Sequence, residues 1–147
     1  MNGFCRVTRR LTFPMAFILP LWLVFGASGG WLTLLFMFIL APALFAILLV
    51  LHFLVSGRTD VVTNKRLNPV DAVTLTVLYV SIFMYGFFVV NGGDTTDSIN
   101  SDAMKLFGRS FQNTSEQLSN VFLTFSIVLI VLTFILFLYE RFAKPLR

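Results

Sequence analysis

Charged side chains are scarce in this chain. Only 12% of its 147 residues are Asp, Glu, Lys or Arg, whereas 57% are apolar. Soluble domains carry about 25% charged and about 45–50% apolar residues. The composition therefore excludes a water-soluble globular domain, and it also excludes a disordered chain, which requires low hydrophobicity.

Cysteine and histidine each occur once, as Cys5 and His52. A single cysteine excludes an internal disulfide framework, and a single histidine cannot supply a di-iron or bis-histidine haem centre. No set of serine, histidine and acid falls on one side of the apolar segments. We therefore expect no enzymatic activity, no metal ion and no cofactor.

Long polar segments are also missing. A membrane-spanning helix needs about 20 apolar residues, and unbroken apolar runs are typical of helices because β-barrel strands alternate apolar and polar residues. The longest segment between runs, 91–120, has 30 residues. The sequence predicts an all-α integral membrane protein, one domain over 1–147, with four transmembrane helices at 11–27, 31–55, 70–90 and 121–139.

The basic residues are unevenly distributed. Nine of the eleven precede the first run, lie between the second and third, or follow the fourth, and only Lys105 and Arg109 lie between the third and fourth. The positive-inside rule then predicts two antiparallel hairpins with both termini in the cytoplasm, in the inner (plasma) membrane of a bacterium. Because topology explains the basic ends, we expect no nucleic-acid partner.

The first apolar run has a basic start, as a signal peptide does. Trp31 begins the second run three residues after Ser28, which leaves a signal peptidase almost no exposed chain. We therefore expect the first helix to be retained.

The first two apolar runs contain prolines. Pro20 and Pro42 lie inside them and predict helix kinks, with the second helix broken near Ala41-Pro42-Ala43. Pro14 is expected in the first turn of the first helix, where a missing N–H costs little. In the third run, Asn68 is a candidate N-cap before Pro69, and Asp71 is expected in the first turn.

The third run carries the most polar intramembrane face, at helical spacing. Its residues are Thr74, Ser81 and Tyr85, with Gly86 beside them. Such a face packs against another helix or lines a pore or ligand cleft, and both interpretations stay open. No ionisable residue lies in the central part of any run, which argues against a proton-coupled carrier that works alone.

The long outer loop, 91–120, combines acidic and apolar residues. After Asp94 and Asp97, a short amphipathic helix is expected over Ser101–Phe111. Its apolar face includes Met104, Phe107 and Phe111. This loop is a candidate surface for a partner protein, although its apolar residues are equally suited to dipping into the outer leaflet.

The last helix has a candidate start before its apolar run. Thr114 and Gln117 match a capping box, which favours a helix that begins outside the membrane.

Two functions fit these observations. The first is a non-catalytic accessory subunit, assembly factor or immunity-type protein that acts through helix and outer-loop contacts with another membrane protein. The second is a small homo-oligomeric pore or carrier, lined by the polar face of the third helix. In both cases the lipid bilayer is the surrounding partner.

Overall fold

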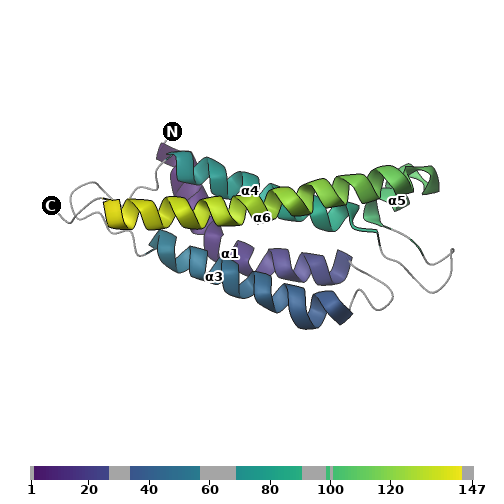
Figure 1. Cartoon of the computed structure of the whole chain (residues 1–147), viewed down its shortest axis with the longest axis horizontal. Helices are drawn as coiled ribbons and strands as arrows, with labels where there is room; N and C mark the ends of the chain where they lie inside the picture. The colour runs from purple at the N-terminus through teal and green to yellow at the C-terminus, as the bar shows by residue number, and fades with distance from the viewer. Residues whose placement is uncertain (1, 27–33, 57–68, 91–98, 100, 144–147) are drawn as a thin grey trace.

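The computed structural model describes residues 2–26, 34–56, 69–90, 99 and 101–143 (Figure 1). Every regular element in these ranges is helical, and four of the helices are long and apolar enough to cross a membrane. The elements are α1 (Asn2–Gly26), the π-helical segment η1 (Phe36–Leu40), α3 (Ala41–Ser56), α4 (Pro69–Phe88), α5 (Asp102–Phe107), the 3₁₀ turn η3 (Arg109–Phe111) and α6 (Gln112–Ala143). The expectation of an all-helical chain with four membrane-length helices is confirmed.

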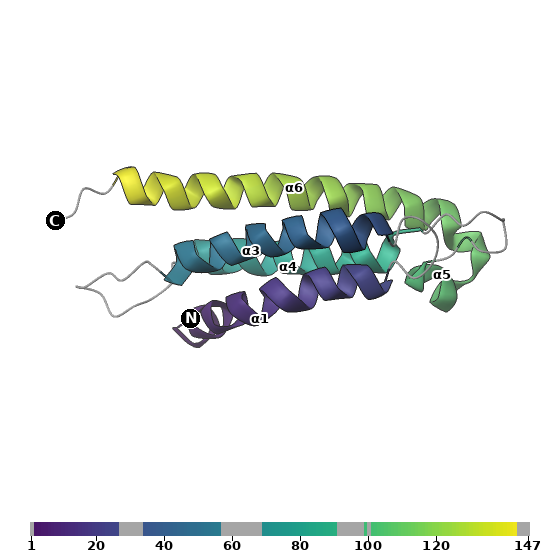
Figure 2. The same cartoon turned by 90° about the horizontal axis from the view of Figure 1, so that it is seen from below.

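The long helices form an elongated bundle in which α1 and α4 carry most of the contacts. α1 packs against α3 and α4, α4 packs against α6, and α3 touches α6 far less. Figures 1 and 2 show α1 and α4 running in one direction and α3 and α6 in the other. The start of α1 and the end of α6 therefore lie at one end of the bundle, here called the N-terminal end. The opposite end carries α5 and is called the α5 end.

Apolar side chains fill the inside of the bundle and also cover its outside. The core includes Phe36, Leu51 and Leu75, whereas Phe38, Phe53 and many other large apolar side chains are exposed on all four long helices. A soluble protein rarely exposes so much contiguous apolar surface. This distribution matches a bundle whose outer surface faces hydrocarbon.

α1 begins nine residues before the apolar run that starts at Leu11. Its first turns bury Cys5, Thr8 and Thr12, which recur at helical spacing. Packing of this narrow face extends the helix beyond the purely apolar segment, and hydropathy alone does not register that face. Pro14 is consequently interior instead of in the first turn, and Figure 1 shows α1 bent along its length.

The helix expected to break near Ala41-Pro42-Ala43 is distorted there instead of interrupted. The helix continues through this point, and the five residues before Ala41 form the wider π-helical turn η1. The backbone N–H of Ala41 donates to the carbonyl of Phe36, five residues back. Pro42 has no N–H and its ring crowds the preceding turn of an α-helix, and the wider turn supplies the room that the ring needs.

α4 begins at Pro69 with Asp71 in its first turn, as predicted, and Asn68 lies outside the described residues. α6 begins at Gln112, well before the run at 121, so the expected start outside the apolar segment holds. Thr114 is already inside this helix, and the capping box predicted there is wrong. η3 leads directly into α6, so the chain needs no side-chain cap at Thr114.

Candidate functional site

The α5 end is held together by serine hydroxyls from separate elements. Ser101 caps α5 by accepting a hydrogen bond from the Met104 N–H at 3.1 Å. Its Oγ lies 3.0 Å from the Oγ of Ser115 on α6, and the Ser115 hydroxyl donates to the Phe88 carbonyl at 2.7 Å. Because the Ser115 proton is used on Phe88, we infer that the Ser101 hydroxyl donates to Ser115.

We call this chain of hydrogen bonds from Met104 through Ser101 and Ser115 to Phe88 the serine bridge. Both serines are fully buried. Phe88 ends α4, where the last carbonyls of a helix lack intrahelical partners. The bridge thus satisfies one of these carbonyls and joins α4, α5 and α6 at one point.

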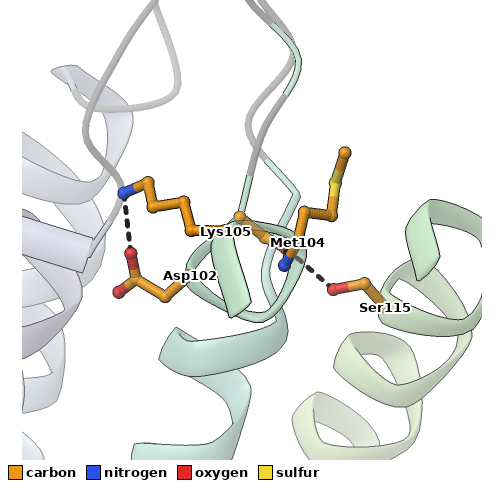
Figure 3. A network of polar contacts seen from close by, with 5 residues as sticks. Asp102, Met104, Lys105 and Ser115 are labelled. Carbon is orange, nitrogen blue, oxygen red and sulfur yellow. Dashed lines mark hydrogen bonds and ion pairs between the residues drawn. The ribbon is translucent and has the colours of Figure 1, made fainter. Parts of the chain in front are cut away.

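The serine bridge fixes which side of α5 faces outward. Ala103 and Met104 are buried beneath the helix, whereas Leu106 and Phe107 are 71% and 61% exposed. Lys105 pairs with Asp102 at 2.8 Å on the surface (Figure 3). Gly108, at a φ of +88° that favours glycine, ends α5 and separates it from η3. The amphipathic helix expected over Ser101–Phe111 is therefore two short pieces.

A chain of phenylalanine rings runs inward from this surface. Phe107 contacts Phe111 with ring centroids 5.1 Å apart, and Phe111 lies 6.4 Å from Phe88. The Phe88 ring stacks on Phe122 of α6 at 5.7 Å. The exposed ring of Phe107 is thus continuous with the packing between α4 and α6.

The outer-loop residues predicted to form one surface differ in their exposure in the structure. Met104 is buried, Phe111 is half-buried and Phe107 is exposed. Asp94 and Asp97 lie outside the described residues. Leu106 and Arg109 are also exposed on this surface, and the serine bridge lies buried beneath it. None of them was assigned to a site from the sequence.

The residues of the predicted polar face of α4 differ in their contacts. The Thr74 and Ser81 hydroxyls donate to Val70 and Val77, four residues back in the same helix. The half-buried ring of Tyr85 meets the edge of Phe36, at the start of η1. Ser81 is itself buried within the single chain.

Gly86 forms the contact between α4 and α1. A Cβ atom at this position would lie 2.6 Å from Nε1 of Trp22. The Trp22 indole N–H donates to the Phe83 carbonyl at 3.2 Å, and its ring stacks on Phe83 at 4.7 Å. The absence of a side chain at Gly86 therefore lets the indole lie against the α4 backbone.

Small hydroxyl residues recur every seven residues along α6. Ser119, Ser126 and Thr133 are buried, and each donates to a carbonyl of its own helix. α4 is the main neighbour of α6, so these residues allow close approach of the two helices. The seven-residue spacing is the signal that would have identified Ser119 from the sequence.

A second polar cluster lies at the N-terminal end. The Thr12 hydroxyl donates to the Arg9 carbonyl at 2.8 Å and also lies 2.8 Å from Nδ1 of His52 on α3. Because the Thr12 proton is used on Arg9, we infer the tautomer of His52 in which the Nδ1–H donates to Thr12. Asp71 is buried at the same end of the bundle. Within the described ranges, no three His, Cys, Asp or Glu side chains gather as metal ligands.

Comparison with known proteins yields no matching family model, no matching curated sequence and no matching solved structure.

Proposed function

We propose that this chain is a non-catalytic membrane protein, an accessory subunit, assembly factor or immunity-type protein, that contacts another membrane protein. Its four long helices cross the inner membrane of a bacterium, and both termini are cytoplasmic. The distribution of basic residues supports this orientation, since nine of eleven then lie on the cytoplasmic side. The α5 end accordingly faces outward.

The observation that carries the proposal is the fixed exposure of Leu106 and Phe107. The serine bridge holds α5 in place while these side chains remain 71% and 61% exposed. Exposed aromatic side chains on a fixed element are typical anchors of protein interfaces, because little conformational entropy is lost when they bind.

The polar side chains within the spans also support a contact function. Thr74, Ser81 and Thr133 donate to carbonyls of their own helices. Ser81 and Gly86 are buried inside one chain, which favours helix packing over a pore lined by this face in a homo-oligomer.

The test is purification of the tagged chain from native membranes in mild detergent, followed by mass analysis of whatever co-purifies. We expect one larger membrane protein at a fixed ratio with the wild type and its loss with Phe107→Asp. Ser110→Asp is the matched control, because it adds the same charge at an exposed position two residues beyond Gly108. It should retain the partner.

Two outcomes contradict the proposal. One is equal retention of the co-purifying protein by Phe107→Asp and Ser110→Asp. The other is a discrete homo-oligomer that conducts a solute in liposomes without any second protein, which would favour the pore.

A further inference from the structure

Four side chains of α1 form a single stripe that changes from basic to aromatic. Arg6, Arg10, Phe13 and Phe17 follow a spacing of four, three and four residues, which places them on one helix face. Both arginines are exposed, and the two rings are 50% and 42% exposed. The arginines lie toward the N-terminal end, and the rings lie further into the apolar part of the bundle.

α3 continues this stripe from the other side. The Phe13 ring lies 5.3 Å from the His52 imidazole, and the Phe17 ring contacts Phe45 at 5.0 Å. His52 and Phe45 are seven residues apart and share one face of α3. We call these six side chains, Arg6, Arg10, Phe13, Phe17, Phe45 and His52, the α1–α3 seam.

Along the seam, the side chains change from basic to aromatic, in the order in which a phospholipid changes from its headgroup to its acyl chains. Phe13 lies beside His52, and Arg10 and Arg6 follow about 5 Å and about 10 Å further along α1, toward the N-terminal end. Basic side chains there meet the headgroup region, while the rings of Phe17 and Phe45 meet acyl chains. His52 lies at the transition and is held by Thr12.

The sign of the charge selects the headgroup. α1 contains three arginines and no acidic residue, and Asp71, at the same end of α4, is buried. Figure 1 shows the start of α1 turned toward the start of α4 and away from α3. Among the described residues, the exposed charge beside the seam is therefore positive, and guanidinium groups bind phosphate with two parallel hydrogen bonds.

We propose that the α1–α3 seam binds one anionic phospholipid from the leaflet at the N-terminal end. Arg6 and Arg10 hold its headgroup phosphate, His52 lies next to the glycerol region, and one acyl chain lies along Phe13, Phe17 and Phe45. This site is independent of the partner surface at the α5 end.

The test measures lipid binding by the full chain in detergent, with phosphatidylglycerol and phosphatidylcholine as probes and native mass spectrometry as the readout. Each basic residue near an anionic surface contributes about a fivefold gain in binding, so Arg6→Gln/Arg10→Gln should weaken phosphatidylglycerol binding about 30-fold. Phosphatidylcholine has the same phosphate but also a cationic choline group, so its binding should be weaker in the wild type and should fall less in the variant. The control Lys105→Gln/Arg109→Gln removes the same charge at the α5 end and should retain the preference for phosphatidylglycerol.

A phosphatidylglycerol with a photoreactive acyl chain locates the site directly. Cross-links should map to α1 around Phe17 and to α3 around Phe45, and Arg6→Gln/Arg10→Gln should reduce them. Circular dichroism and size exclusion verify that this variant is folded. Equal loss of binding in the two double variants, or cross-links confined to α4 and α6, would overturn the proposal.

Discussion

The ends and the middle of this bundle use hydroxyl groups in different ways. At the ends, hydroxyls connect elements, as Ser115 does between α5 and α4 and as Thr12 does between α1 and α3. In the middle, the hydroxyls of Ser81, Ser126 and Thr133 each donate to a carbonyl four residues back in the same helix. Side-chain packing therefore holds the helices together in the middle of the bundle, whereas hydrogen bonds between elements hold its ends.

This difference follows from the surroundings. A hydroxyl in hydrocarbon must be satisfied, and its own helix offers a carbonyl four residues back at every position. At a helix end, carbonyls such as that of Phe88 lack partners and attract donors from elsewhere. In the middle of the bundle, a substitution should therefore lower stability mainly when it changes side-chain volume. At the ends, a substitution should lower stability mainly when it removes a hydrogen-bond donor.

The largest effect is expected at Gly86. Gly86→Ala places a methyl group 2.6 Å from Trp22 Nε1, so the indole must move and lose its hydrogen bond to Phe83. Overpacking of this kind costs about 1–3 kcal/mol. Denaturation in mixed detergent, followed by circular dichroism, measures the loss.

Gly3→Ala is the matched control for Gly86→Ala. Nothing lies within 4 Å of a Cβ at Gly3, which is also inside α1. Alanine is a better helix former than glycine, so this variant should be unchanged or slightly more stable. Equal destabilisation by the two substitutions would show that the contact between Trp22 and Gly86 does not hold α1 against α4.

An intermediate effect is expected for the serine bridge. Ser115→Ala leaves the half-buried Phe88 carbonyl and the buried Ser101 hydroxyl without this partner, which costs about 1–2 kcal/mol. The cost falls on the docking of α5, so hydrogen exchange at the Met104 amide should accelerate while α1 and α3 stay protected.

Ser110→Ala removes an exposed hydroxyl close to the serine bridge and serves as its control. Exchange at Met104 should match the wild type in this variant. Unchanged exchange in Ser115→Ala would mean that packing of Ala103 and Met104 alone holds α5 in place.

A smaller effect is expected at the N-terminal end. Thr12→Val keeps the shape of the side chain but removes the acceptor for His52, and such bonds average about 0.6 kcal/mol in membranes. Nitrogen NMR of the His52 ring should report a proton on Nδ1 in the wild type and a changed tautomer ratio in the variant. A wild-type ring without a proton on Nδ1 would reverse the assigned direction of the bond.

The four long helices could be predicted because each contains an apolar run of membrane length. The start of α4 and the early start of α6 could also be predicted, but the start of α1 and the exact first residue of α6 could not, because they depend on packing of narrow faces. Thr8 and Ser119 are buried within otherwise polar segments, and a hydropathy reading treats them as surface residues. The π-helical turn before Pro42 was likewise hidden, since a proline in a sequence predicts a disturbance but not its form.

The candidate site was predictable only where residues close in sequence act together. Phe107 and Phe111 could be selected by spacing, and Gly86 by its small size next to a polar face. Ser101 and Ser115 are fourteen residues apart on different elements, and their partner Phe88 is on a third. A hydrogen-bonded chain of this kind exists only after α5 has folded back over α4, so no local pattern in the sequence marks it.

The smallest effect is expected for Ser81→Ala, and substitutions at this position also separate the two candidate functions. Its hydroxyl donates to the Val77 carbonyl of the same helix, so Ser81→Ala should change stability by less than about 0.5 kcal/mol. Ser81→Leu adds volume at a buried position and should destabilise the bundle by about 1–3 kcal/mol. If Ser81 lines a pore, the order reverses for function: Ser81→Ala alone should abolish solute flux in liposomes while the fold stays intact. Flux that is absent from the wild type, together with a mild Ser81→Ala and a damaging Ser81→Leu, leaves packing as the role of this face.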